Sequence, residues 1–417
     1  MPGEGLSEGK PSGERLTALV STFLWFGAAV SLAEILTGTF FASLGLAAGI
    51  GAILIGHVIG GAVFFLVAYI SAKTGRSAME SVRISFGRHG SLVFSISNIA
   101  QLTGWTAIMV FSGSVAAQYL MPQLERGLWC VVIGALIVVW SALGLRKMAK
   151  FQAIASGLLF VLTLLMCRVV FGDPGAQVPS PPSDPLSFGA AVELAAAMPL
   201  SWLPVVGDYT RRARKPLAGA TSTTLAYTLG SCWMFVIGLG AALFAASADI
   251  TAILAATGLG AGISTVVLST VTTAFLDAES AGVSAQSIFP RANARLLGIG
   301  VAITGVVLAM FVPVAHFEGF LYLIGSVFAP MAAILAVDFF IFRNDASSKP
   351  ASLENLALWA AGFMLYRISM AWDTPLGNTL PVLLIVAAFS CAVKVYIRKR
   401  QGRLAPGLAI PERNDRP

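Results

Sequence analysis

The chain is dominated by long apolar runs, many of them long enough to cross a lipid bilayer. A membrane-spanning helix needs about 20 apolar residues, and in lipid only helices and closed barrels satisfy the backbone hydrogen bonds. The runs are continuous rather than alternating, which excludes the strands of a barrel. Of the 417 residues, 57% are hydrophobic and 11% are charged, against about 25% charged in soluble proteins. The sequence therefore predicts an all-α polytopic membrane protein.

Twelve membrane spans can be placed along the sequence. They are predicted at residues 17–41, 47–72, 91–119, 127–144, 150–171, 187–206, 218–246, 258–284, 294–313, 318–342, 353–372 and 378–397. No long polar stretch separates them, so we expect one integral membrane domain.

The basic residues predict the orientation of these spans. With an even number of spans both termini share one side, and that side receives all 27 Lys and Arg residues except Arg126, Arg168 and Arg367. Because cytoplasmic loops carry the excess of Lys and Arg, both termini are predicted to be cytoplasmic. Topology and lipid contact then explain the net charge of +7 without a nucleic-acid partner. The polar first 15 residues contain no evident cleavable signal, and we expect a multi-pass protein of the inner (cytoplasmic) membrane.

Four polar side chains interrupt the apolar runs at mid-depth: Glu34, Gln101, Asp277 and Glu279. A charge near the bilayer centre costs at least roughly 2.5–3.5 kcal/mol, so such residues usually face a cavity, a partner or a solute path. They are the first candidates for function.

A Pro-rich segment, GDPGAQVPSPPSDP within residues 172–187, lies between the fifth and sixth spans. Two halves of a five-plus-five inverted repeat would be joined there, and many secondary transporters bind substrate between such halves. The predicted units are a cytoplasmic tail (1–16), two repeats (17–171 and 187–342), two additional helices (353–397) and a second cytoplasmic tail (398–417).

In such a repeat, spans 1 and 6 are equivalent, as are spans 3 and 8. Span 6 contains Pro199 and Pro204, each of which removes a helical hydrogen bond and so favours a break or a packed kink. Span 1 carries small residues at 27–29 and Ser31, which permit unwinding or close helix packing. Glu34, Gln101, Asp277 and Glu279 lie on spans 1, 3 and 8. All four polar residues therefore belong to these two pairs of equivalent helices.

Hydroxyl groups on span 8 are candidates for a cation site. Ser269, Thr272 and Thr273 are spaced i, i+3, i+4 and share one helix face. Their oxygens suit sodium, although such hydroxyls also bond back to their own helix. Asp277 and Glu279 lie two residues apart and point about 200° from each other, so they cannot both line one site.

Gln101 and Trp105 on span 3 are spaced i, i+4 and share a face. An indole can stack on a planar heterocycle, and an amide offers it both a donor and an acceptor. Glu34 could accept from an exocyclic amine, carry a coupling proton or pair with a buried cation, or it could form a purely structural hydrogen bond between helices. We find no catalytic triad, phosphate-binding loop or zinc-ligand spacing, so the sequence does not favour an enzyme or predict a cofactor.

Several stretches resemble the nucleobase:cation symporter family, which includes bacterial cytosine permeases and hydantoin transporters. They are YISAKTGRSAMESVRISFG (69–87), the Gly104–Trp105 pair, GDYTRRARK (207–215), the paired threonines 272 and 273, and APMAAILAVDFFIFR (329–343). The likeness is greatest to the CytX branch of proposed hydroxymethylpyrimidine transporters, through WFGAAVSLAEILTG at 25–38.

This resemblance implies a LeuT-like fold of two inverted five-helix repeats plus two further helices, which imports a heterocyclic base by alternating access. By the resemblance, Trp105 is a stacking aromatic, and Ser201 and Trp202 touch the base. It also implies that Thr272 and Thr273 are sodium ligands, completed by backbone carbonyls around Ala28 and Ser31. Asp208 with Arg211 is implied to be a gating or structural motif at the cytoplasmic end of span 6.

The resemblance has two departures. Gln101 lies four residues before Trp105, where the cytosine permeases place a glutamine three residues before. Span 8 reads AFLDAES after the paired threonines, where those permeases are rich in asparagine. An added carboxylate, Glu34 or Asp277, would suit an aminopyrimidine.

We therefore expect a sodium-coupled importer of a pyrimidine, most specifically hydroxymethylpyrimidine, a thiamine precursor. The alternatives are a proton-coupled permease for cytosine or another nucleobase, an integral membrane enzyme and a bundle that does not transport. The expected partners are a small heterocyclic substrate and membrane lipid, with no obligate protein partner evident.

Overall fold

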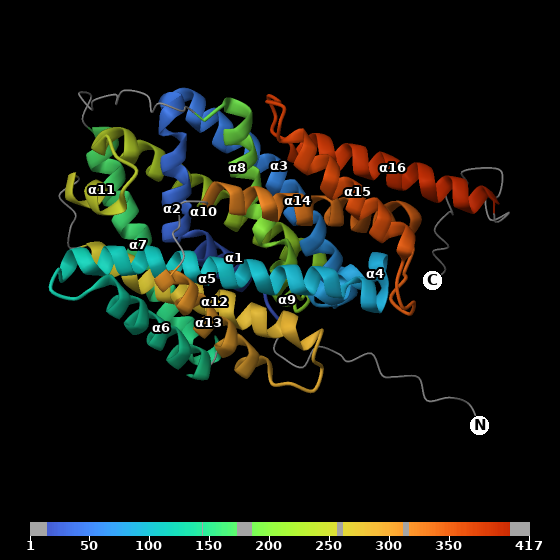
Figure 1. Cartoon of the computed structure of the whole chain (residues 1–417), viewed down its shortest axis with the longest axis horizontal. Helices are drawn as coiled ribbons and strands as arrows, with labels where there is room; N and C mark the ends of the chain where they lie inside the picture. The colour runs from blue at the N-terminus through green and yellow to red at the C-terminus, as the bar shows by residue number, and fades with distance from the viewer. Residues whose placement is uncertain (1–14, 144, 173–185, 257–261, 312–316, 401–417) are drawn as a thin grey trace, which may run out of the picture.

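The computed structural model describes residues 15–143, 145–172, 186–256, 262–311 and 317–400 (Figure 1). Every element in these ranges is a helix, apart from one isolated bridge between Leu16 and Ala213. The predicted all-α fold is thus confirmed for the described part of the chain. The Pro-rich segment at 173–185 and most of the two predicted tails (1–14 and 401–417) lie outside the described residues.

The first half of the chain forms eight elements. They are α1 (Ala18–Ala29), α2 (Leu32–Thr39), the 3₁₀-helix η1 (Phe40–Leu44), α3 (Gly45–Thr74), α4 (Ala78–Gly90), α5 (Leu92–Leu120), α6 (Arg126–Leu143) and α7 (Leu145–Gly172). The second half continues with α8 (Phe188–Ser201), α9 (Leu203–Thr210), α10 (Pro216–Ala245), α11 (Ile250–Ala256), α12 (Ile263–Gln286), α13 (Ala294–Phe311), α14 (Phe317–Ala336), the π-helix η3 (Val337–Phe342), α15 (Leu353–Ser369) and α16 (Thr379–Arg400).

Within the described ranges, nine helical segments are long and apolar enough to cross a membrane. Each of the twelve predicted spans overlaps a helix, but α1, α12 and α15 are not among the nine, so the count of twelve stays a prediction. The multi-pass character is confirmed. The sequence did not predict α4 and α11, because both helices are too short to cross a membrane.

The first predicted span is broken in its middle. α1 ends at Ala29 and α2 begins at Leu32, while Val30 (φ −80°, ψ 82°) and Ser31 (φ −138°, ψ 159°) leave the helical region. The small residues before Ser31 permit this break, and the predicted unwinding of span 1 is confirmed. Backbone groups on both sides of the break consequently lose their helical partners.

The sixth predicted span is also interrupted, between its two prolines. α8 contains Pro199 in its last turn, α9 has Pro204 in its first, and Trp202 separates the two helices with φ −90° and ψ −6°. Pro204 cannot donate a hydrogen bond, so the helical ladder cannot run through this point. The chain deviates less from a helix here than at Val30 and Ser31. Of the two predicted alternatives, a break or a packed kink, the structure shows a short interruption at Trp202.

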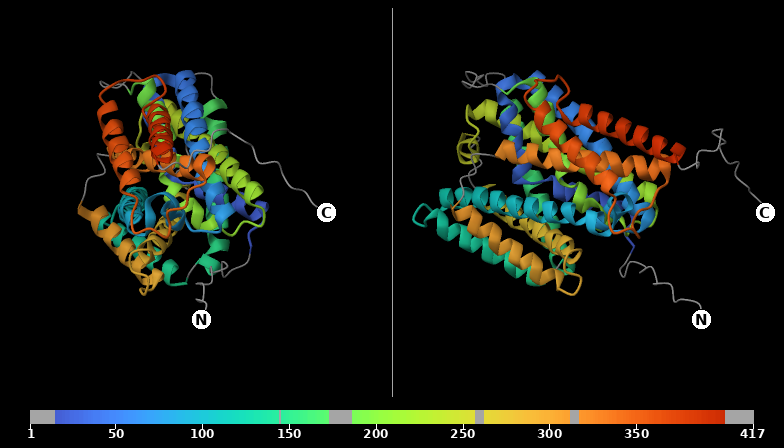
Figure 2. Two further views of the ribbon diagram at one scale, coloured as in Figure 1. Left: turned by 90° about the vertical axis from the view of Figure 1, so that its right-hand side faces the viewer. Right: turned by 45° about the vertical axis from the view of Figure 1, so that its right-hand side comes forward.

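The helices pack around these two interrupted spans. α10 packs against α1, α2 and α3, and α3 packs against α8. On the other side α5, α12, α13 and α6 form a separate group, which the views of Figures 1 and 2 show beneath the first. α15 and α16 lie against α14 at the outer edge of the bundle (Figure 1). The broken spans therefore lie where the two groups of helices meet.

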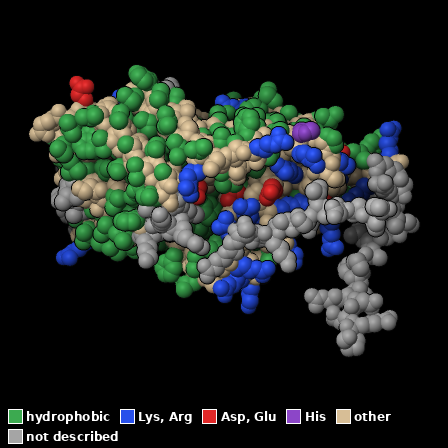
Figure 3. Space-filling model, turned by 90° about the horizontal axis from the view of Figure 1, so that it is seen from below, with side chains coloured by type: hydrophobic (Ala, Val, Ile, Leu, Met, Phe, Trp, Pro, Cys, Tyr) green, Lys and Arg blue, Asp and Glu red, His purple; other side chains and the backbone are tan. Residues whose placement is uncertain are grey.

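The surface separates apolar from basic regions. Large side chains such as Leu54, Leu229 and Phe311 are exposed, and on the face shown in Figure 3 hydrophobic atoms cover much of the molecule. On that face Lys and Arg gather toward one end. An apolar belt next to a basic end is the arrangement expected of a protein embedded in lipid.

Candidate functional site

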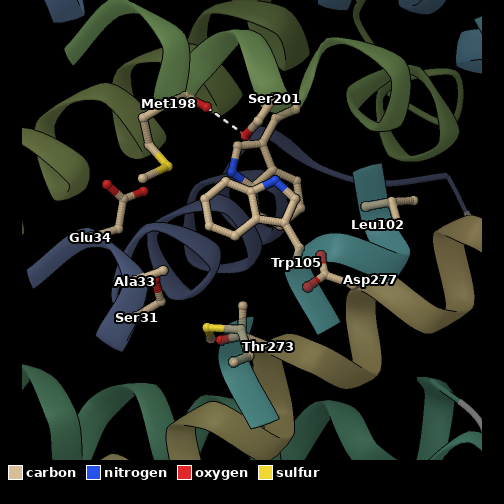
Figure 4. Close-up of a pocket in the computed structure, with 11 residues that line it drawn as sticks. Ser31, Ala33, Glu34, Leu102, Trp105, Met198, Ser201, Thr273 and Asp277 are labelled. Atoms are coloured by element: carbon tan, nitrogen blue, oxygen red, sulfur yellow. Dashed lines mark hydrogen bonds between the residues drawn. The ribbon is translucent and has the colours of Figure 1, made fainter. Parts of the chain in front are cut away.

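The two breaks open onto one buried pocket, drawn in Figure 4. It is lined by residues of α2 and its cap, α5, the junction of α8 with α9, and α12. These residues are Ser31, Ala33, Glu34, Leu102, Trp105, Met109, Met198, Ser201, Trp202, Thr273 and Asp277. The four contributors correspond to predicted spans 1, 3, 6 and 8, so the expected convergence of these spans is found.

Two indoles occupy much of the pocket. Trp105 packs edge-on against Phe320 with ring centroids 5.6 Å apart, and Trp202 packs edge-on against Trp25 at 5.6 Å. The free space that remains is about 20 Å³, enough for about one water molecule. Both rings are thus held by aromatic neighbours in a contracted pocket.

Glu34 and Asp277 lie on opposite sides of the Trp105 indole (Figure 4). Tyr227 donates a hydrogen bond to Glu34 Oε1 at 2.8 Å, and Ser231 Oγ lies 2.6 Å from Oε2. Asp277 is 4% exposed, and among the described residues no hydrogen bond or ion pair to its carboxyl group is found. Glu279 does not line the pocket, as its direction relative to Asp277 predicts. One carboxyl group is therefore anchored and the other is available to a ligand.

Close packing of α2 against α10 places the partners of Glu34. Gly38 lies against the backbone of Phe235, and Gly238 lies against the backbone of Ile35, so side chains at these glycines would collide with the facing helix. The two helices thereby approach closely enough for α10 to present its hydroxyl groups to Glu34.

Gln101 is not among the residues that line the pocket. Its Nε2 donates to the Ser201 carbonyl at 2.7 Å and to Asn98 Oδ1 at 2.8 Å. Asn98 in turn donates to Ser284 on α12. These amides satisfy a carbonyl at the break of span 6, which would otherwise be buried without a partner. Gln101 Oε1 is buried without a hydrogen bond among the described residues, so contact with a base stays a prediction.

Of the predicted cation ligands, Ser269 reaches the first break, and Thr273 lines the pocket together with Ser31. Ser269 Oγ is 3.5 Å from the Val30 carbonyl, while Thr272 and Thr273 donate to the Ser269 carbonyl at 2.7 and 3.1 Å. Both threonine oxygens keep lone pairs for a cation. Among the described residues, no hydrogen bond to the Ala28 carbonyl is found.

Ser31 lies in the first break, and Ser201 is the last residue of α8, directly before the second. Ser31 precedes α2 in an extended conformation and lines the pocket. Ser201 also lines the pocket, and its hydroxyl donates to the Met198 carbonyl at 2.7 Å (Figure 4). Both predicted contacts are thus located at the pocket wall.

The end of span 6 that carries Asp208 and Arg211 is tied to α4. Asp208 Oδ1 accepts from the Ala78 N–H at 3.1 Å, and Arg211 lies 3.7 Å from Glu80. Ser77 and Glu80 form a capping box at the start of α4. This contact joins α9, which follows the pocket residue Trp202, to α4. A gating or structural role of Asp208 with Arg211 stays a prediction.

Sequence reasoning missed several participants. Tyr227, Ser231 and His57 support Glu34 from behind the pocket, while Met109 and Met198 line it. These residue types are common in apolar helices and carry no spacing signal. Asn98 could have been predicted from its spacing, because it precedes Gln101 by three residues and so shares its helix face.

A family model described as "Permease for cytosine/purines, uracil, thiamine, allantoin" matches residues 11–391. The cytosine permease of Escherichia coli strain K12 is 25% identical over 363 residues, covering 84% of this chain and 85% of that protein. A putative purine-cytosine permease of Bacillus subtilis strain 168, YxlA, is 26% identical over 242 residues, covering 55% of this chain and 51% of that protein.

Solved structures show the same fold at low sequence identity. Mhp1 in an inward-facing conformation has a TM-score of 0.76 at 17% identity and covers 97% of this chain and 99% of its own. Closed Mhp1 with bromovinylhydantoin bound has a TM-score of 0.76 at 18% identity, with 94% and 95% covered. A sodium-coupled sialic acid symporter in a substrate-bound outward-open state has a TM-score of 0.66 at 15% identity, with 95% and 92% covered.

These likenesses confirm the Mhp1-like (LeuT-like) fold, and the family match excludes the enzyme alternative. The match leaves the narrower CytX assignment open. The chain belongs to the family of permeases for cytosine/purines, uracil, thiamine and allantoin, which are membrane transporters of small, nucleobase-type heterocycles.

Proposed function

We propose that this protein imports a pyrimidine, most specifically hydroxymethylpyrimidine, by alternating access coupled to sodium. The observation that carries the proposal is the pocket where the breaks of the first and sixth spans meet. Transporters of this architecture bind substrate and coupling ions at such discontinuous helices. The resemblance of WFGAAVSLAEILTG at 25–38 to the CytX branch supports the choice of pyrimidine.

The composition of the pocket suits a flat, amino-bearing base. Trp105 and Trp202 offer aromatic faces, while Glu34 and Asp277 supply acceptors on opposite sides of Trp105. The amino group of an aminopyrimidine, and a ring nitrogen once it is protonated, would donate to these acceptors. Because the free space is about 20 Å³, a base can enter only after the indoles or helices move apart. We therefore assign this conformation to a contracted state of the transport cycle.

Oxygen atoms beside the first break support sodium as the coupling ion. The Val30 carbonyl, freed by the break, lies 3.5 Å from the Ser269 hydroxyl of α12, and Thr272 and Thr273 follow on the same helix. Neutral carbonyl and hydroxyl oxygens at unwound helices are typical sodium ligands in this architecture. A bound sodium ion would also stabilise the contact between α12 and the break.

The main alternative is a proton-coupled permease for cytosine or another nucleobase. The 25% identity to a cytosine permease over most of both chains favours that substrate. The hydrogen-bonded environment of Glu34 favours a proton, because a buried carboxyl group is a natural proton carrier. Both versions place the base in the same pocket.

We further propose that both termini face the cytoplasm from the inner membrane. Leu16 exchanges backbone hydrogen bonds with Arg212 and Arg214, at 2.8 and 3.0 Å. Arg76 pairs with Asp345 at 3.0 Å. The N-terminal segment thus lies at the same end of the sixth span as a basic loop, as the positive-inside distribution requires.

A thermal-shift screen of the purified protein tests the proposal. Hydroxymethylpyrimidine, cytosine, uracil and a hydantoin would each be added in sodium chloride and in choline chloride. Stabilisation by hydroxymethylpyrimidine only in sodium supports the proposal. Equal stabilisation by cytosine in both salts would favour the alternative, and insensitivity to every base would indicate a bundle that does not transport these compounds.

A further inference from the structure

Behind Glu34, hydrogen bonds lead from the pocket into the packed interior. Ser231 Oγ lies 2.6 Å from Glu34 Oε2 and 2.6 Å from His57 Nε2. The other ring nitrogen, His57 Nδ1, lies 2.9 Å from the Ile53 carbonyl. Glu34 and His57 are each 1% exposed and Ser231 is fully buried. The three side chains therefore form a continuous chain shielded from solvent.

The number of hydrogens in this chain follows from its geometry. A carbonyl can only accept, so His57 Nδ1 must carry a hydrogen. Ser231 has one hydrogen for two neighbours. If it points to Glu34, then Nε2 needs its own hydrogen and His57 is an imidazolium. If it points to His57, then Glu34 must be protonated to donate to Ser231.

Either arrangement contains one proton more than a carboxylate with a neutral imidazole. Without that proton, two lone pairs would face each other across one of the two 2.6 Å contacts. Such an unsatisfied buried contact is costly. The hydrogen-bond geometry thus requires one bound proton.

The surroundings decide where this proton resides. The titratable groups that face Glu34 are Tyr227 and Cys232 on α10, His57 on α3 and, across the pocket, Asp277 on α12. Among the described residues, no Lys or Arg forms an ion pair with Glu34. Separating a carboxylate from an imidazolium in this buried region costs more than keeping both groups neutral.

We propose that Glu34, Ser231 and His57 form a single-proton site at the wall of the pocket, with the proton on Glu34 when the pocket is empty. Glu34 then presents an uncharged carboxyl group to the pocket, so a neutral base can bind beside it without leaving an unpaired ion. The proposal rests on the proposed function only in taking this pocket as the transport site.

Infrared spectroscopy of the purified, ligand-free protein at neutral pH tests the site. We expect the C=O stretch of a protonated carboxylic acid that shifts when glutamate is labelled with carbon-13, a label that leaves Asp277 unchanged. The band should disappear in Glu34→Gln. It should persist in Glu279→Gln, which removes a half-buried carboxyl group outside the pocket.

A second pair of variants tests the connection to Ser231. Ser231→Ala should move the band, because the acid loses its hydrogen-bond acceptor. Ser222→Ala is the control, since its hydroxyl on the same helix donates to the Gly219 carbonyl. If Glu34→Gln does not fold, the labelled wild type and Ser231→Ala decide the question.

Two outcomes would overturn the proposal. In the first, the labelled wild type shows only carboxylate bands at neutral pH. In the second, the C=O band of the protonated acid keeps its position in Ser231→Ala. Because no ligand is present in this experiment, its outcome is separate from that of the thermal-shift screen. Failure of every base to bind would count against the proposed function and leave the infrared result standing.

Discussion

Ser269 on α12 directs its hydroxyl group at the carbonyl of Val30, 3.5 Å away, and so joins the eighth predicted span to the break in the first. The break frees the Val30 carbonyl at mid-span, and α12 carries Thr272 and Thr273 on the same helix as Ser269. If sodium binds between them, the two segments are linked most strongly when the ion is present. The coupling ion would then control how the first span packs on α12.

Removing hydroxyl oxygens beside the break should weaken sodium binding. Thr272→Val and Thr273→Val each delete one candidate ligand while changing side-chain shape little. We expect the sodium concentration for half-maximal thermal stabilisation to rise about tenfold or more, which corresponds to ~1.4 kcal/mol. Thr270→Val is the control, because Thr270 donates within its own helix to the Val266 carbonyl. Unchanged sodium dependence in both test variants would contradict the site.

Trp105 should contribute to base affinity through its ring. Stacking of a base on an aromatic side chain contributes about 1–3 kcal/mol, so Trp105→Leu should weaken pyrimidine binding about tenfold or more, and Trp105→Phe should retain part of the affinity. Isothermal calorimetry measures the difference. The control is Trp372→Leu at an exposed position after α15, outside the pocket. Equal losses at the two positions would indicate general damage rather than stacking.

Gln101 should stabilise the break of span 6. Gln101→Leu leaves the buried Ser201 carbonyl without the amide donor that now lies 2.7 Å away, at a cost of about 1–3 kcal/mol. A lower melting temperature in detergent, relative to Thr103→Val, is the expected result, because Thr103 donates only within α5 to the Ile99 carbonyl. If Gln101→Leu keeps the wild-type melting temperature but loses base binding, Gln101 is a ligand contact instead.

The contact of α4 with α9 should weaken in acid. Burial raises the pKa of Glu80, but hydrogen bonds from Ser77 and the charges of Arg211 and Arg83 outweigh it and hold that pKa below its ordinary value. A carboxyl group with a lowered pKa contributes stability above its unfolded-state pKa, and this contribution is lost as pH falls through the folded-state value.

Glu80→Gln should therefore lower the melting temperature at neutral pH and flatten its fall toward acid pH. Thermal scans across this pH range test the prediction, with Glu125→Gln, at an exposed position, as the control. Parallel pH profiles for wild type and Glu80→Gln would show that this contact does not respond to acid.

The sequence predicted the parts of the site that leave a local signature. Pro199 and Pro204 marked the second break, and the small residues before Ser31 marked the first. Glu34 and Asp277 were predicted because charge is costly in an apolar run, and both line the pocket. The spacing of Asp277 and Glu279 also predicted correctly that the two side chains do not both line the pocket.

Other features depend on packing that no local pattern records. The hydrogen bonds of Glu34 to Tyr227 and Ser231 arise because Gly38 and Gly238 let α2 approach α10, far apart in the sequence. Similarly, Gln101 shares a helix face with Trp105, yet its amide is drawn to the Ser201 carbonyl. The contraction of the pocket around two indoles is equally a property of the assembled helices.

Uptake by the purified protein in proteoliposomes tests whether it imports a pyrimidine together with sodium. With an inward sodium gradient, the wild type should accumulate labelled hydroxymethylpyrimidine, while vesicles with choline outside and vesicles carrying Trp105→Leu should accumulate much less. If neither hydroxymethylpyrimidine nor any other pyrimidine accumulates under a sodium or a proton gradient, this protein is not a pyrimidine importer.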